Sequence, residues 1–275
     1  MRSWTGPALA APATAWLLAA FAAPMIVVVL LSVQPGSDPF VPIGLRPSLE
    51  QFAAVLTDSF YISVLLKTTA LSVGVCVAAV LLGYPFALWL VSLTPKWRPV
   101  AMSIVVIPLL VNVVVRSLGI ELLLAPDGLI NDAFALVGLP RANHMLFNYG
   151  AIGIGLLQVF LPLMILSLYD SLQAVSPRVL EASRNLGASR VTQFFTVELP
   201  MSLPGLRAGL IFVFLMSSTT YVSARMLGGK QAWATGMLVW QDVLENLDAQ
   251  FASALALVMT AVSLIATLAV AHFAL

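Results

Sequence analysis

Charged residues are scarce in this sequence. Only 9% of its 275 residues are Asp, Glu, Lys or Arg, and 60% are hydrophobic, whereas about a quarter of a soluble domain is charged. A soluble fold of this length could not bury so much apolar surface, so the composition predicts a membrane protein. A net charge of +1 argues against a nucleic-acid partner. The single cysteine, Cys76, excludes an internal disulfide and is expected to be a small packing residue.

Six apolar runs are long enough to cross a bilayer as helices, which takes about 20 residues. The runs lack the period-two alternation of membrane-barrel strands. The first run is too long for a cleaved signal peptide, so we expect it to be a retained helix. The predicted fold is therefore an all-α membrane protein, one transmembrane domain over residues 1–275, with helices at 13–33, 62–93, 100–124, 149–168, 206–227 and 251–273.

Lysine and arginine set the predicted orientation, because cytoplasmic loops carry an excess of them. Six spans place both termini on one side, which then holds seven basic residues against six on the other. Lys96 and Arg98 crowd the short turn between the second and third runs on that same side. We therefore expect both termini, and the polar segment 171–205, to be cytoplasmic.

The polar segment 171–205 is expected to fold into two short helices with a break between them. Ser176 followed by a proline indicates a capped helix start. Gly187 stands where a left-handed helix end needs glycine. Ser189 can cap the second helix, and Pro200 is expected to end it.

Apolar side chains give this segment an unusual surface. Val191, Phe194 and Phe195 fall on one face of the second predicted helix. Aromatic side chains presented to water favour a docking surface for another protein. The alternative is an ordinary loop of two helices lying at the membrane interface.

The same segment resembles the signature loop of the permeases of binding-protein-dependent ABC importers. That pattern is Glu-Ala-Ala, three residues, Gly, nine residues, Ile, one residue and Leu-Pro, and every spacing is kept here, with Ser183 in place of the second alanine and Val197 in place of isoleucine. The resemblance implies a type I ABC importer permease arrangement in which this loop is the coupling helix. The residues it assigns to the contact with an ATP-binding subunit are Glu181, Ala182, Ser183, Gly187, Val197, Leu199 and Pro200.

The resemblance also implies partners and a location. They are two ATP-binding subunits, a second permease subunit expected to be a non-identical homologue, and a periplasmic solute-binding protein, all at the bacterial inner membrane. ATP and Mg are expected on the ATP-binding subunits, with no cofactor on this chain and no enzyme activity of its own. The glycines before Lys230 lack the spacing of a phosphate-binding loop. Weaker matches at 107–116, 128–131, 146–149 and 227–229 resemble the spermidine/putrescine-type permeases.

Polar groups inside spans are costly and often line a path. Asn112 and Arg116, four residues apart, are expected on one face of the third span. The alternative for Arg116 is a pair with Glu121 near the interface. A hydroxyl cluster on the fifth span is the second candidate lining, although hydroxyls also mediate ordinary helix packing. Its members are Ser217, Thr220 and Tyr221.

The solute stays open at this level. A path for polycations should offer carboxylates, yet no Asp or Glu lies in the middle of a predicted span. A polyamine-like solute, an amino-acid derivative and an organophosphonate all remain candidates. An ion-coupled secondary transporter is the alternative class, but the sequence shows neither the internal repeat nor the midplane carboxylate common in such carriers.

Overall fold

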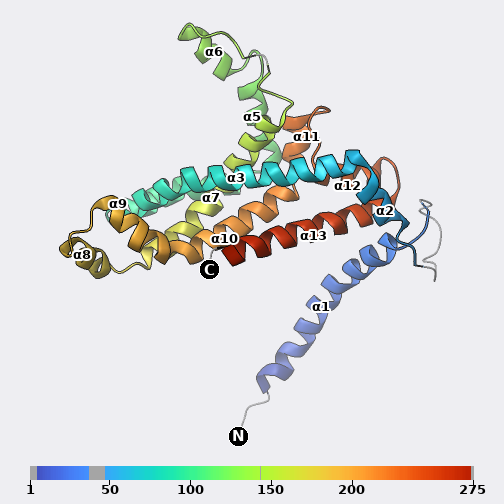
Figure 1. Cartoon of the computed structure of the whole chain (residues 1–275), viewed down its shortest axis with the longest axis horizontal. Helices are drawn as coiled ribbons and strands as arrows, with labels where there is room; N and C mark the ends of the chain where they lie inside the picture. Colours follow the sequence, from blue (N-terminus) through green and yellow to red (C-terminus); the bar gives the residue numbers. More distant parts are fainter. Residues whose placement is uncertain (1–4, 37–46, 143, 274–275) are drawn as a thin grey trace. The chain divides into compact units, whose positions relative to one another are not determined.

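The computed structural model describes residues 5–36, 47–142 and 144–273, and over these ranges the chain is helical and contains no strand (Figure 1). This confirms the predicted all-α class. The helices are α1 (Thr5–Ser32), α2 (Glu50–Thr57), α3 (Ser59–Ser92), α4 (Arg98–Leu110), α5 (Val113–Leu124), α6 (Leu129–Leu136), α7 (Tyr149–Gln173), α8 (Pro177–Asn185), α9 (Arg190–Gln193), the π-helical turn η1 (Phe194–Glu198), α10 (Leu199–Ser218), α11 (Val222–Gly228), α12 (Thr235–Leu244) and α13 (Ala249–Phe273).

Five of the described helical runs are long and apolar enough to cross a bilayer. They are Ala10–Ser32, α3, α7, the continuous run Arg190–Ser218 and Ala249–Ala269, and a sharply bent pair of helices makes a sixth if it is taken as one span. With 34 residues, α3 is about 51 Å long. It exceeds the hydrocarbon thickness of about 30 Å, so it is tilted or extends beyond the bilayer core.

The predicted third span, 100–124, is not one straight helix. It is α4 followed by α5, and the structure bends by 97° between them. Val111 is extended, and the side chain of Asn112 accepts a hydrogen bond from the backbone N–H of Val114 at 2.8 Å, which starts a new helix. With 13 and 12 residues, each helix alone is too short to span.

The predicted fifth span, 206–227, is also interrupted. Helix α10 ends at Ser218, and α11 begins at Val222. In the last turn, the hydroxyls of Ser218 and Thr219 donate to the carbonyl of Leu215 at 3.0 and 3.1 Å. Such bonds compete with the backbone ladder and favour a helix end.

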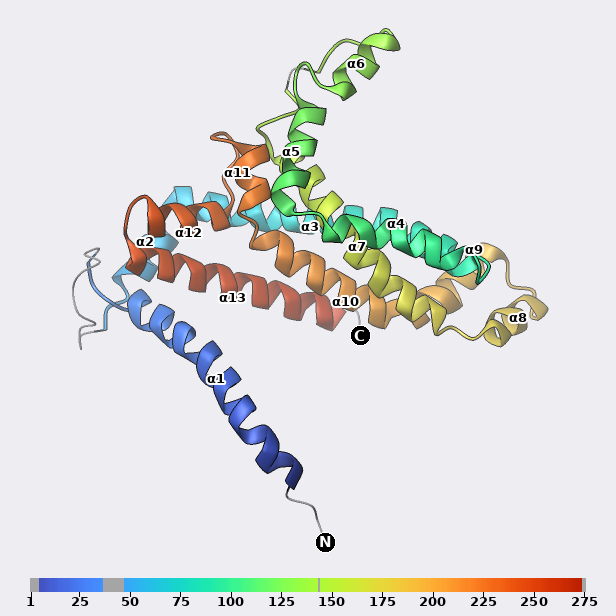
Figure 2. The same cartoon turned by 180° about the vertical axis from the view of Figure 1, so that it is seen from behind.

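By internal contacts the chain forms two units. The second unit, residues 63–237 with 262–275, has α7 at its centre, which packs against α10, α4, α5 and α11; Figure 2 shows α4 lying along α7. Glycines bring α10 onto α7: a Cβ at Gly205 would lie 2.2 Å from the carbonyl oxygen of Ser167, and one at Gly209 would lie 2.6 Å from the sulfur of Met164. Small residues of this kind let membrane helices approach closely.

The first unit comprises residues 1–62 and 238–261. It holds α1, α2, the start of α3 and much of α12 and α13. The amphipathic helix α2 buries Gln51 and Val55, and the Gln51 amide donates to the carbonyl of Gly36 at 2.8 Å. The ring of Tyr61 packs on that of Phe251 at 4.8 Å, so α3 and α13 meet within this unit.

Candidate functional site

The polar segment after α7 folds into a short helix, α8, which begins at Pro177. Ser176 precedes it with φ −64° and ψ 130°, but its side chain makes no capping hydrogen bond. The prediction that the Ser176 side chain caps this helix is therefore wrong. Proline explains the start without a cap, because its fixed φ suits the first turn and it has no N–H to satisfy.

Gly187 ends α8 as the sequence predicts. Its φ is +85°, in the left-handed region. The N–H of Gly187 donates to the carbonyl of Arg184 at 2.9 Å, and the N–H of Ala188 donates to that of Ser183 at 3.1 Å. These two bonds form the Schellman arrangement, which satisfies the last carbonyls of a helix.

The second helix differs from the prediction. Its start is as expected, since the hydroxyl of Ser189 accepts from the N–H of Thr192 at 3.2 Å. Pro200, however, does not end it: Arg190–Ser218 is one continuous run. The π turn η1 precedes Pro200, with the N–H of Leu199 donating to the carbonyl of Phe194. A π turn shifts the backbone hydrogen-bond register by one residue. The helix can therefore continue past Pro200 even though proline has no N–H to donate.

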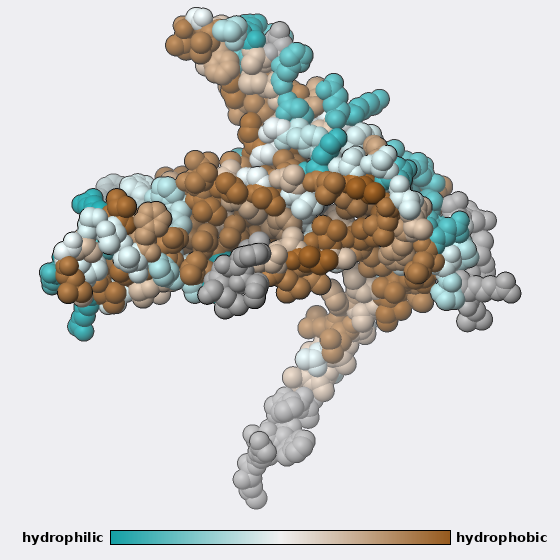
Figure 3. Space-filling view, in the orientation of Figure 1, coloured by the Kyte–Doolittle hydropathy of each residue, from teal (hydrophilic) through white to brown (hydrophobic). Residues whose placement is uncertain are grey.

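Exposed apolar side chains gather on this part of the chain. Leu186 is 89% exposed, Val191 68% and Phe195 60%. Phe194 points the other way and packs on the ring of Tyr84 at 5.2 Å, so one of the two expected surface aromatics belongs to the core. In Figure 3 the surface around α8 and α9, at the left, mixes hydrophilic residues with isolated hydrophobic ones. These uncovered side chains suit a protein partner.

A buried amide braces the segment. Gln193 is 3% exposed, and its carbonyl oxygen accepts from Nε of Arg184 at 3.0 Å. Its amide nitrogen donates to the carboxylate of Glu198 at 3.0 Å. Because these bonds join α8 to η1 across α9, they hold the short helix in a fixed orientation on the long one.

The residues of the signature pattern lie in two places that this brace connects. Glu181, Ala182 and Gly187 are exposed, and Ser183 is half-buried with its hydroxyl bonded to the carbonyl of Leu180 at 2.8 Å. The second group comprises the half-buried Val197 and Leu199 and the exposed Pro200. Helix α8 contacts both α9 and η1, so the structure brings the two halves of the pattern together.

The candidate path residues of the third span lie at the start of α5, where the N–H of Arg116 donates to the carbonyl of Asn112 at 3.1 Å. Asn112 caps α5, and Arg116 lies within that helix. Nε and Nη1 of Arg116 are buried and have no hydrogen-bond partner. Among the described residues Arg116 makes no ion pair with Glu121. The alternative prediction, a pair between these two residues, is therefore wrong. A role for Asn112 and Arg116 in a path stays a prediction.

The hydroxyl cluster of the fifth span lies at the break between α10 and α11. Ser217 is fully buried and donates to the carbonyl of Phe214 at 3.1 Å, and Thr220 is 9% exposed. A Cβ on Gly236 of α12 would lie 2.5 Å from the carbonyl oxygen of Thr220. Ser217, Thr220 and Tyr221 thus lie on both sides of the end of α10. Their role in a path also stays a prediction.

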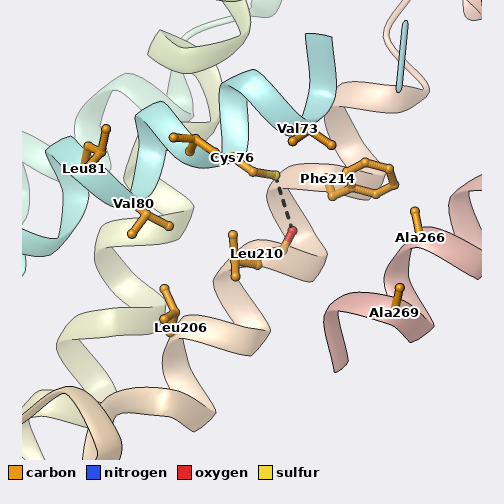
Figure 4. A pocket seen from close by; sticks show the side chains of 10 residues that line it. Val73, Cys76, Val80, Leu81, Leu206, Leu210, Phe214, Ala266 and Ala269 are labelled. Atoms are coloured by element: carbon orange, nitrogen blue, oxygen red, sulfur yellow. Dashed lines mark hydrogen bonds between the residues drawn. The ribbon is translucent and has the colours of Figure 1, made fainter. Parts of the chain in front are cut away.

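An apolar groove of about 490 Å³ lies in the second unit, among side chains of α3, α10 and the end of α13 (Figure 4). Cys76 lines it, is 6% exposed and sits 3.8 Å from the carbonyl of Leu210. This confirms that Cys76 is a packing residue. The other lining side chains shown are hydrocarbon, so the groove suits apolar packing and offers nothing to a polar solute.

Two buried polar features escaped the sequence reasoning. The hydroxyl of Thr68 accepts from the N–H and the hydroxyl of Thr235 at 3.1 and 3.2 Å, a contact set only by tertiary packing. Asp242, in α12, is 6% exposed. It lies in a short helix between the last two predicted spans. The sequence around a single acid in such a helix does not indicate that the acid is buried. No group of three or more metal-ligating side chains is present among the described residues.

Comparison with known proteins gives relatives over most of the chain. The spermidine/putrescine transport system permease protein PotB of Haemophilus influenzae is 32% identical over 206 residues, 74% of this chain and 72% of that protein. PotB of Escherichia coli (strain K12) is 30% identical over 208 residues, 75% of this chain and 76% of that protein. A bacterial alginate ABC transporter, in complex with an alginate pentasaccharide-bound periplasmic protein, contains a chain with a TM-score of 0.78 at 17% identity, covering 98% of this chain and 94% of its own. No family model matches.

Proposed function

The chain belongs to the family of membrane-spanning permease subunits of ABC importers, and on that premise we propose how its parts serve transport. As such a permease it is a multi-pass protein of the inner membrane, and ATP hydrolysis takes place on separate subunits. It works with other subunits of an ABC importer and with a periplasmic binding protein.

We propose that α8 is the coupling helix and docks on an ATP-binding subunit. The observation that carries this proposal is the combination of an exposed apolar side chain, Leu186, with a helix end fixed by Gly187 and braced through Gln193. A rigid, exposed short helix is what a docking contact requires, because ordering it on binding would otherwise cost affinity. In this proposal the segment 171–205 and both termini lie in the cytoplasm.

The proposed complex contains two ATP-binding subunits, with ATP and Mg bound there, and a second permease subunit that is a non-identical homologue. ATP binding closes the ATP-binding subunits and moves α8. The helices of the two permeases then reorient around a central path. Arg116, Ser217, Thr220 and Tyr221 are proposed to lie along it, with Asn112 setting the bend that exposes it.

The proposed solute is polyamine-like. The support for this is that the relatives are spermidine/putrescine transport system permeases. The first unit carries the carboxylates Asp58, Asp242 and Asp248. These negative charges favour a cationic solute over an amino-acid derivative or an organophosphonate, each of which carries an anionic group.

The docking role is tested by Leu186→Ser, with Leu136→Ser as a matched control. Both side chains are leucine and both are 89% exposed, but Leu136 lies in α6. We expect Leu186→Ser to weaken capture of the ATP-binding subunits by the permease pair about tenfold, as for a central apolar contact, with thermal stability unchanged. Leu136→Ser should leave capture at the wild-type level. Equal capture by both variants would rule out α8 as the docking helix.

A further inference from the structure

A buried carboxylate in the first unit has an oxygen without a partner. Oδ1 of Asp242 accepts a hydrogen bond from the Asn246 side chain at 2.8 Å. Oδ2 is buried and has no hydrogen-bond partner. Burial of an acceptor without a donor is costly. This oxygen is therefore placed for a donor that the described chain does not supply.

Two further carboxylates lie within electrostatic range of Tyr61, as Asp242 does. Asp58, Asp242 and Asp248 are all close enough to the hydroxyl of Tyr61 to act on it electrostatically. Asp58 and Asp248 have a structural role, since each caps a helix by accepting a backbone N–H, at 2.8 and 2.9 Å. Helix capping does not account for Asp242, so it calls for another explanation.

No cation of the described chain neutralises these three acids. Within residues 5–36, 47–142 and 144–273 the ion pairs are those of Arg141 with Asp127 and Asp132. Burial and the charge of Asp248 raise the pKa of the Asp242 carboxyl, and the hydrogen bond from Asn246 lowers it. A cation bound beside Asp242 would offset both raising causes and stabilise the ionised form.

Aromatic rings stand beside the carboxylates. The ring of Tyr61 lies 5.3 Å from that of Phe60 and 4.8 Å from that of Phe251. Aromatic faces attract ammonium groups and also pack on hydrocarbon chains. Carboxylates and rings together match a solute that alternates ammonium groups with methylene segments.

The carboxylates also differ in burial. Asp58 is exposed, Asp248 is half-buried and Asp242 is buried, so negative charge continues from the surface inward. The three do not come together as a metal site, because no described group of three acidic, histidine or cysteine side chains could hold a metal ion. Separated carboxylates suit a ligand that carries several cationic groups along a chain.

We infer that Asp242, with Asp58, Asp248 and the ring of Tyr61, binds an alkylammonium group of the transported solute. This inference rests on the proposed function as a permease for a polyamine-like solute. The ammonium donates to Oδ2 of Asp242, the oxygen that has no donor within the described chain, and its methylene chain packs on the aromatic rings. The site lies within the first unit.

The test compares Asp242→Asn with Glu245→Gln in the complete importer, reconstituted with its binding protein. The control removes the same charge from an exposed residue three positions along. With spermidine as the probe, Asp242→Asn should raise the apparent KM for uptake about tenfold, the scale of one charge-assisted hydrogen bond. ATP hydrolysis without solute should stay at the wild-type rate, and Asp242→Glu should restore part of the affinity. Equal uptake by Asp242→Asn and Glu245→Gln would overturn the inference.

A second measurement separates the site from the proposed solute. An apolar carbodiimide modifies carboxyl groups, and peptide mass spectrometry reports the extent of modification at Asp242. We expect putrescine to protect Asp242 in the wild-type complex, and KCl at matched ionic strength not to protect it. Protection without spermidine uptake would support the ammonium site and refute the proposed solute. Equal protection by KCl and putrescine, or none by either, would refute the site.

Discussion

Replacing Gly187 tests whether α8 depends on a left-handed residue. The φ of Gly187 is +85°, and an added Cβ would meet no atom within 4 Å. The substitution Gly187→Ala therefore costs only backbone strain, about 1 kcal/mol. Asparagine adopts this region more readily, so Gly187→Asn should cost roughly half as much.

A cost of about 1 kcal/mol corresponds to a roughly fivefold change in an equilibrium constant. The strain acts at the end of α8, where the N–H groups of Gly187 and Ala188 bond to the carbonyls of Arg184 and Ser183. These bonds should fray in Gly187→Ala, and the equilibrium constant between the docking-competent orientation of α8 and its frayed orientations should fall about fivefold. The helices packed on α7 do not depend on this turn, so global unfolding should not change.

The assay is solute-stimulated ATP hydrolysis by the complete importer at limiting concentrations of the ATP-binding subunits. We expect half-maximal activation to need more of these subunits for Gly187→Ala than for Gly187→Asn, by at most about fivefold and about twofold respectively. Identical behaviour of both variants and the wild type would refute the dependence on the helix end. Complete loss in both would show that the partner touches the glycine backbone, and would refute backbone strain as the cause.

Two further predictions concern packing and the brace. Gly205→Ala should prevent α10 from packing on α7, because its Cβ would lie 2.2 Å from the carbonyl oxygen of Ser167. The control is Gly74→Ala, where an added Cβ meets nothing within 4 Å. Similar melting temperatures for the two variants would contradict the close approach of the helices. Gln193→Leu keeps the side-chain volume but removes the hydrogen bonds to Arg184 and Glu198. It should destabilise the segment by about 1–3 kcal/mol and speed proteolysis between α8 and α9. An unchanged cleavage rate would show that these two hydrogen bonds are dispensable.

The apolar runs revealed the class of the fold but not where the helices break. Hydropathy averages over about 20 residues, and it is blind to single-residue events such as the Asn112 cap or the π turn before Pro200. A proline such as Pro200 predicts a helix end, which is its usual effect. Here the register shift in η1 compensates for the missing N–H, and this depends on the geometry of the whole turn.

Local chemistry predicted the turn of the candidate site well. The left-handed Gly187 and the Ser189 cap both follow from rules that act within four residues. The inward-facing Phe194 and the brace through Gln193 depend on neighbours distant in the sequence or on rotamers. The burial of Asp242 is a tertiary property of the same kind, because its own short helix does not reveal it.

The unbroken run from Arg190 to Ser218 has a mechanical consequence. At 29 residues it is about 44 Å long, and its helical backbone is continuous through the π turn η1. A tilt of about 10° at the end next to α8 would displace the other end by about 8 Å. That far end is the break at Thr219, where the chain changes direction. The run is a lever: a small push on the short helix arrives as a large displacement at the opposite end.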